Sequence, residues 1–250
     1  MSEISLIINT VSKNKDVWPM FFDQLQKHIP EGLFNEKHVF VNKCEDAFPE
    51  DYKVSYFDSD KLYREQFLSC IDNVKDEFCV YISEDYILYD DVKSNLVDEF
   101  VSVLKNNSDI SFIRFMRGGT VDLMHKYKNH ESLYKLYNYL PYFYTNQAAL
   151  WRTKDLHKIH YYGPNLHIAN TDSENSFEFQ ATTTCEQLGL DGVFYYDNEP
   201  KRGMYHYDSK IFPHISTALV KGKWNLSEYN TELSPLIKKY QIDTSNRGAV

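Results

Sequence analysis

Two adjacent carboxylates, Glu84 and Asp85, directly follow the apolar run 78–82. Acids at the mouth of a buried strand repel each other and lose hydration, so both effects oppose their ionisation. A divalent cation would relieve both costs, and carboxylate oxygens suit Mg²⁺ or Mn²⁺. The pair therefore indicates a metal site. The alternative is a solvated strand end, since the loop stays acidic at Asp90 and Asp91.

Three other groups of residues have types and spacings that could do chemistry. Glu174 and Glu178 are one helical turn apart and share a face of a helix predicted over 172–188. The structural alternative is a capping box, because Thr171 and Glu174 have its spacing. The remaining groups are the acidic segment 58–60, followed by Arg64, and the block 201–225, which carries His206, His214 and Lys223.

The elements that must position these residues alternate between strands and helices. The predicted strands are 4–11, 38–41, 53–57, 78–82 and 110–116, with helices starting near Asp16 and Asp60 and over 91–104. This alternation predicts an α/β fold with a mainly parallel sheet flanked by helices. Ligands bind beyond the C-terminal strand ends of such sheets. Thr10 and Val11, the segment 58–60 and the acid pair are expected to converge there.

Composition excludes several classes of protein. The 250 residues carry a net charge of −9, which argues against a nucleic-acid surface. The four cysteines form no C-x-x-C pair, so neither a zinc knuckle nor a redox motif is expected. No apolar stretch approaches the roughly 18 residues of a membrane span. With no signal-peptide pattern at its start, the chain is expected to be cytoplasmic.

The order strand, loop, helix, strand, strand, helix, strand, acid pair resembles the N-terminal half of GT-A glycosyltransferases. That family carries Asp-x-Asp where this chain has Ser83-Glu84-Asp85, so the first Asp is absent. The resemblance implies that Asp85 is the metal ligand and that Glu84 lies on the ribose side. It also implies that Asp58, Asp60 and Arg64 lie near the donor nucleotide. Otherwise, Asp60 is a helix cap and Arg64 an exposed helix residue.

The segment from Glu174-Asn175 to Gly189 and Tyr195 resembles the acceptor-side helix of inverting GT-A enzymes. There, a carboxylate at the helix start removes the proton from the acceptor hydroxyl, a contribution of about 10²–10⁴-fold. Glu174 is the first candidate for this base. Glu178 replaces it if Glu174 caps the helix.

The block 201–225 resembles one in glycosyltransferase-like proteins of viruses and phages. It is also similar to the C-terminal His and Gly-x-Lys-Trp elements of other GT-A enzymes. This implies His206, then His214, as a further ligand of Mn²⁺ or Mg²⁺, and Lys223 as a cation for the diphosphate. Alternatively, a His among tyrosines is a hydrogen-bonded structural residue, and Trp224 beside Lys223 is packing.

The resemblance, over residues 4–225, implies a metal-assisted, inverting transfer of sugar from a nucleoside-diphosphate sugar to a glycan or other hydroxyl acceptor. One domain is expected over 1–250. It comprises a nucleotide-sugar-binding half (1–119), an acceptor-side half (120–226) and a peripheral polar tail (227–250).

Two alternatives belong to other classes. A nucleotidyltransferase would carry a Gly-rich, basic loop after its first strand, and the segment 10–15 contains no Gly. A non-catalytic carbohydrate- or protein-binding module would have lost the first motif acid and would bind without metal.

Overall fold

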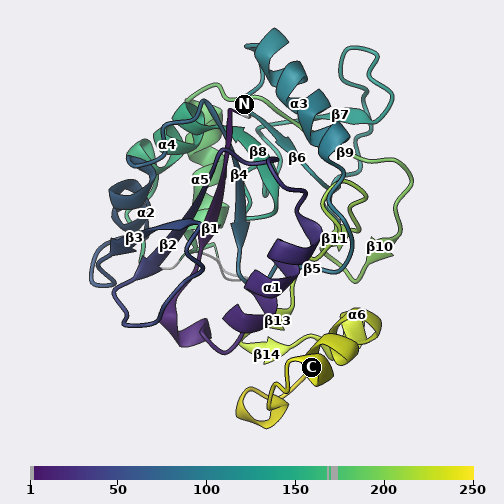
Figure 1. Ribbon diagram of the computed structural model, residues 1–250. Coiled ribbons are helices and arrows are strands. Elements are labelled where there is room, and N and C mark those ends of the chain that lie inside the picture. The colour runs from purple at the N-terminus through teal and green to yellow at the C-terminus, as the bar shows by residue number, and fades with distance from the viewer. Residues whose placement is uncertain (1–2, 168, 170–173) are drawn as a thin grey trace.

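The computed structural model describes residues 3–167, 169 and 174–250 (Figure 1). In this part of the chain eight strands form one sheet, in the order β3-β2-β1-β4-β8-β6-β9-β7. These strands are β1 (Ile4–Asn9), β2 (Glu36–Asn42), β3 (Tyr52–Phe57), β4 (Phe78–Ser83), β6 (Phe112–Arg114), β7 (Leu133–Leu136), β8 (Ala149–Arg152) and β9 (Gly192–Tyr195). β8 runs antiparallel to both neighbours and β7 antiparallel to β9, whereas the other pairs are parallel. The predicted α/β fold with a mainly parallel sheet is confirmed.

Helices cover both faces of this sheet (Figure 1). α1 (Trp18–His28) and α3 (Ser94–Asn106) pack on one face, and α2 (Tyr63–Ile71), α4 (Thr153–Tyr162) and α5 (Phe177–Gln187) on the other. Alternation along β1 explains the two cores, because successive side chains of a strand point to opposite faces. Leu6 and Ile8 join the α1 and α3 core, whereas Ile7 joins the α2, α4 and α5 core. β7 and α4 were not predicted from the sequence.

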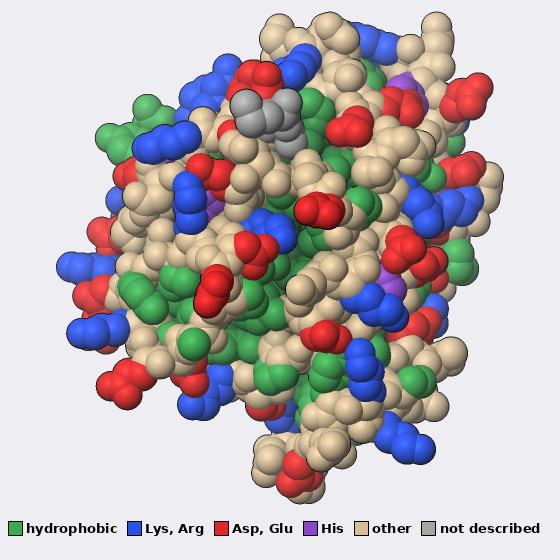
Figure 2. All heavy atoms as spheres, in the orientation of Figure 1, with side chains coloured by type: hydrophobic (Ala, Val, Ile, Leu, Met, Phe, Trp, Pro, Cys, Tyr) green, Lys and Arg blue, Asp and Glu red, His purple; other side chains and the backbone are tan. Residues whose placement is uncertain are grey.

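Short strand pairs and single-turn helices complete the fold. The two-stranded pairs are β5 (Ile87–Leu88) with β12 (His214–Ile215), β10 (Lys201–Arg202) with β11 (His206–Tyr207), and β13 (Leu219–Val220) with β14 (Lys223–Trp224). Single-turn helices are η1 (Ser12–Asn14) and η2 (Thr244–Asn246). None of the helices in the described segments combines the length and apolar character needed to cross a bilayer. Figure 2 shows acidic and basic side chains interspersed over one face, with hydrophobic ones gathered at its centre.

The helix starts differ from those predicted. Asp16 does not cap α1 but pairs with Arg247. α2 follows Leu62, and the carboxylate of Asp58 instead accepts the Asp60 N–H at 3.0 Å within a turn. α5 begins at Phe177, where the Ser176 hydroxyl accepts the Phe179 N–H at 3.3 Å. Thr171 of the expected capping box lies outside the described residues.

The segment 227–250, predicted as a peripheral polar tail, contains regular structure. These residues include most of α6 (Leu226–Lys239), which buries Tyr229 and Leu233. α6 lies below α1 in Figure 1. The last residues pair with β14, where the Trp224 N–H donates to the Gly248 carbonyl at 3.0 Å. Leu236, Ile237, Tyr240 and Ile242 also pack, partly buried, against the core of α1 and α3.

Candidate functional site

The two acids after β4 lie in different environments. Glu84 is 6% exposed, and its Oε1 accepts a hydrogen bond from the Asn14 amide of η1. Burial raises the pKa of Glu84, while hydrogen bonds from Asn14 and Thr10 lower it. Asp85 is half-buried, and burial and then Glu84 hold its pKa well above its ordinary value. Of the two, Asp85 is therefore the carboxylate still open to a ligand.

Glu84 belongs to a network of side-chain hydrogen bonds around the loop that follows β1. The Trp18 indole donates to the Thr10 hydroxyl at 2.8 Å, and Arg247 Nη2 donates to Asn14 Oδ1 at 3.1 Å. Val11, half-buried, accepts the Asn14 N–H at 2.9 Å through its carbonyl. The structure thus brings the predicted donor-side residues Thr10, Val11 and Glu84 together, and adds Asn14 and Arg247.

Glu178 shares the electrostatic environment of Asp85. It lies in the first turn of α5, and its Oε1 accepts the Asn146 N–H at 2.8 Å. Burial raises the pKa of Glu178, while Asn146 and the positive charge of Arg114 lower it. Glu178 in turn raises the pKa of Asp85. Segments 93 residues apart in sequence therefore place two half-buried carboxylates at one end of the sheet.

Arg114 is the cation of this site, and the sequence analysis missed it. It is the last residue of β6, is 3% exposed, and donates through Nη2 to the Tyr142 and Phe143 carbonyls at 2.9 and 2.8 Å. Burial lowers its pKa to about 10, and Glu178 and Tyr86 oppose this. Arg114 therefore stays charged at neutral pH. A lone Arg inside the apolar run 110–116 was the available signal.

Tyrosine hydroxyls line the same end of the sheet. Asn9 Nδ2 donates to the hydroxyls of Tyr63 and Tyr81 at 3.2 and 3.4 Å, and the Tyr144 hydroxyl donates to Asn146 Oδ1 at 3.2 Å. Burial is the largest cause of the raised pKa of all three tyrosines, and Glu178 adds to it. These hydroxyls stay protonated at neutral pH. They therefore add uncharged hydrogen-bonding groups, and no negative charge, to the surroundings of Glu178.

Other residues predicted for the site lie apart from this cluster or face other partners. Glu174 is exposed and precedes α5, and its carbonyl accepts from the Gln180 amide at 3.1 Å. Asp58 and Asp60 are exposed in the turn before α2. Arg64 donates to the Tyr161 carbonyl at the end of α4 at 2.7 Å. Of the two base candidates, Glu178 is thus the one held in the site.

The two histidines proposed as metal ligands occupy buried positions around β12 and α6. His206 Nε2 lies 2.7 Å from the Tyr229 hydroxyl, and the His214 ring packs 5.4 Å from that of Tyr86. Burial lowers the pKa of both to about 4. Among residues 3–167, 169 and 174–250, no three His, Cys, Asp or Glu side chains form a group that could hold a metal. The structure therefore does not gather Asp85, His206 and His214 into one site.

Of the three predicted metal ligands, Asp85 is the one that lies in this site. Burial first, and then the carboxylates of Glu84 and Glu178, raise its pKa, and no Lys, Arg or His within the described ranges forms an ion pair with it. Lys223 is exposed on β14 and follows Gly222, whose carbonyl accepts from Arg247 at 3.4 Å. This short turn places a second cation beside the loop after β1.

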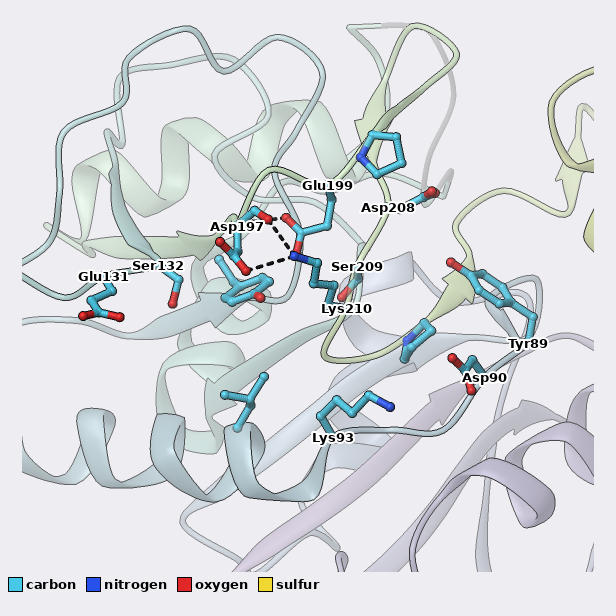
Figure 3. A pocket seen from close by; sticks show the side chains of 14 residues that line it. Tyr89, Asp90, Lys93, Glu131, Ser132, Asp197, Glu199, Asp208, Ser209 and Lys210 are labelled. Atoms are coloured by element: carbon cyan, nitrogen blue, oxygen red, sulfur yellow. Dashed lines mark hydrogen bonds and ion pairs between the residues drawn. The ribbon is translucent and has the colours of Figure 1, made fainter.

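A separate cavity of about 630 Å³ opens beside the start of α3 (Figure 3). None of the catalytic, donor-binding or metal-binding residues predicted from the sequence lines it. Its charged lining consists of Asp90, Glu131, Asp197, Glu199, Asp208, Lys93 and Lys210. Lys210 is already paired with Asp197 at 2.9 Å. Five carboxylates against two lysines would repel a diphosphate, so this cavity is not the donor site.

No protein-family model matches the chain, and no curated protein sequence matches it. Solved structures do match. S. aureus TarS 1-349 in complex with UDP-GlcNAc has a TM-score of 0.51 at 16% identity, covering 84% of this chain and 59% of that one. Its complex with UDP has a TM-score of 0.51 at 16% identity, covering 83% and 60%. A third is 4-diphosphocytidyl-2C-methyl-D-erythritol synthase from Anaerococcus prevotii, with a TM-score of 0.47 at 9% identity, covering 86% and 91%.

These similarities concern the fold alone. The chain has an α/β fold similar to that of TarS 1-349. It spans about three fifths of the length of TarS 1-349. The resemblance expected to proteins of viruses and phages finds no support in these bacterial structures.

Proposed function

We propose that this protein is a glycosyltransferase that moves a sugar from a nucleoside-diphosphate sugar to an acceptor hydroxyl with inversion. The observation that carries the proposal is the pairing of Asp85 and Glu178 opposite Arg114 at the C-terminal ends of β4 and β6. This is the end of an α/β sheet where ligands bind, next to the switch point between β1 and β4. The shared fold supports the proposal, because TarS carries UDP-GlcNAc in its complex.

Glu178 is the proposed general base. A base needs an ionised carboxylate near the acceptor hydroxyl, with a pKa raised toward the working pH. Burial raises the pKa of Glu178, while Arg114 and the Asn146 N–H favour its ionised form. The Asn146 contact also fixes the carboxylate orientation, because the N–H is part of the backbone. Arg114 would then stabilise the negative charge that develops around the reacting atoms.

The donor diphosphate would lie between Asp85 and the loop after β1. A divalent cation held by Asp85 would offset the charge of the diphosphate as the leaving group departs. Lys223, exposed on the nearby turn, is the cation that we propose for the diphosphate. Asp58 and Asp60 remain proposals for the ribose and base, as does Arg64. His206 and His214 would act on the site only through packing.

The loop after β1 argues against nucleotidyl transfer. Such an enzyme would need backbone N–H groups and cations around a triphosphate at this position. Here Asn14 of the same loop is hydrogen-bonded to the carboxylate of Glu84. The segment 10–15 also contains no Gly that would let its backbone N–H groups approach a triphosphate closely. All four cysteines are free thiols, which supports the reducing cytoplasm as the compartment.

A ligand screen tests the proposal. Nucleoside diphosphates and UDP-GlcNAc, each with and without Mn²⁺, are added while the thermal unfolding midpoint is followed. Ligand at about 100 times its Kd should add about 2.7 kcal/mol of stability. We expect stabilisation that requires Mn²⁺ and that Asp85→Asn abolishes, together with release of the nucleoside diphosphate. Sugar binding without nucleotide, metal or turnover would instead identify a non-catalytic module.

A further inference from the structure

A strip of alternating tyrosines and cations runs along the β7 and β9 side of the sheet. We call the half-exposed rings of Tyr134, Tyr196 and Tyr207, with Lys126, Arg117 and Lys201, the tyrosine strip. The Lys126 ammonium lies 4.3 Å from the Tyr134 ring centroid. The Arg117 guanidinium lies 5.1 Å from the ring of Tyr196 and 4.6 Å from that of Tyr207. The six side chains therefore form one continuous surface, which ends at Lys201, 5.9 Å from Tyr207.

The strip adjoins the proposed reaction site. Tyr134 and Tyr196 pack on the same core as α5, so they share the sheet face of Glu178. A side chain at Gly118 would lie 3.3 Å from Arg114 Nη1, and Gly118 is bridged to His206 of β11. The Gly119 N–H donates to the Tyr205 carbonyl at 2.6 Å. Gly118 and Gly119, which follow Arg114 in sequence, therefore contact the hairpin that carries Tyr207.

In the described part of the chain, the cations of the strip donate to backbone carbonyls and not to acids. Lys126, Arg117 and Lys201 all donate to backbone carbonyls, the last two to Val121 and Gly119. No carboxylate within residues 3–167, 169 and 174–250 forms an ion pair with any of them. In a chain of net charge −9 this is an unbalanced positive surface. It can attract an anion, because exposed cations over aromatic faces keep their charge.

We propose that the tyrosine strip binds the acceptor and that the acceptor is an acidic saccharide. The half-exposed rings offer apolar edges beside the cations that lie over their faces, and the three cations meet carboxylate, sulfate or phosphate substituents of a saccharide. A saccharide laid along the strip would reach Glu178 past Arg114. The inference rests on the proposed transferase function, because it names the class of molecule whose hydroxyl Glu178 deprotonates.

Binding of defined oligosaccharides tests the strip separately from catalysis. Chondroitin sulfate oligosaccharides are the acidic probe, neutral dextran oligosaccharides of equal length the control ligand, and titration calorimetry the measurement. We expect the acidic probe to bind with a salt-dependent Kd and the neutral one to bind far more weakly. The double variant Lys126→Gln/Lys201→Gln should weaken binding about tenfold, since it removes two exposed charge contacts.

The matched control is Lys75→Gln/Lys154→Gln, which removes two exposed lysines near the start of β4, in the middle of the sheet. It should leave the Kd unchanged. Both double variants should keep the wild-type unfolding midpoint and the same UDP affinity. Equal weakening by the two variants, or equal binding of a single-stranded oligonucleotide of the same charge, would overturn the acidic-saccharide assignment.

The outcomes separate this inference from the proposed function. Acidic saccharide binding that depends on Lys126 and Lys201, without any nucleotide binding, would uphold the strip and refute the transferase. Nucleotide binding and turnover with no such saccharide binding would refute the strip alone.

Discussion

Replacing Glu178 by Gln removes the proposed base while keeping the shape of the site. The Gln side-chain oxygen can still accept the Asn146 N–H, which lies 2.8 Å from Oε1 in the structure. Only the charge and the proton affinity are lost. A general base contributes about 10²–10⁴-fold, so the transition state should lose about 2.7–5.4 kcal/mol of stabilisation. We therefore expect kcat to fall by at least a hundredfold with little change in nucleotide affinity.

The assay is release of UDP from UDP-GlcNAc, measured with and without acceptor, alongside UDP binding by calorimetry. Glu174→Gln is the matched control, because Glu174 is exposed and should leave kcat unchanged. In the wild-type enzyme, kcat/KM should fall as the pH drops through the raised pKa of Glu178, so this acid limb lies above 4.5. A Glu178→Gln enzyme with more than a tenth of wild-type kcat, or a large loss in Glu174→Gln, would refute the assignment.

Three further predictions concern stability and the donor side. Asp85→Asn should raise the unfolding midpoint while abolishing turnover, because burial and two neighbouring carboxylates make the ionised Asp85 costly; a lower midpoint would contradict this. Burial lowers the pKa of His214 to about 4, so the free energy of unfolding should decline by up to about 3 kcal/mol as the pH falls from 6.5 to 4. Urea titrations should show a flatter pH slope in His214→Leu, and an unchanged slope would be evidence against it. Arg247→Met should raise the KM for the donor more than it changes kcat, since Arg247 contacts Asn14 and Asp16. The control Lys239→Met breaks an exposed ion pair with Asp23 and should leave this KM unchanged.

The second half of the chain shows where sequence reasoning failed. The prediction of a polar tail missed α6 because its buried residues, Tyr229 and Leu233, are few and widely spaced. The choice of Glu174 before Glu178 assumed that the helix began near 172. The helix begins at Phe177, with Ser176 as its cap, so Glu178 lies in the first turn. Helix ends depend on a few local hydrogen bonds, which similar polar residues can supply at neighbouring positions.

The sequence alone determined the alternation of strands and helices, because hydrophobic periodicity follows directly from strand and helix geometry. It also determined that Glu84 and Asp85 follow a buried strand, at the C-terminal end where α/β sheets usually bind ligands. Only the tertiary structure decided that the two acids have different environments. Glu84 is hydrogen-bonded to Asn14, whereas Asp85 feels the charge of Glu178. The tertiary structure also decided that Arg114, and not a histidine, is the charged partner of Glu178 at this site. Such assignments depend on contacts between segments far apart in the chain, and no local pattern of residues encodes those contacts.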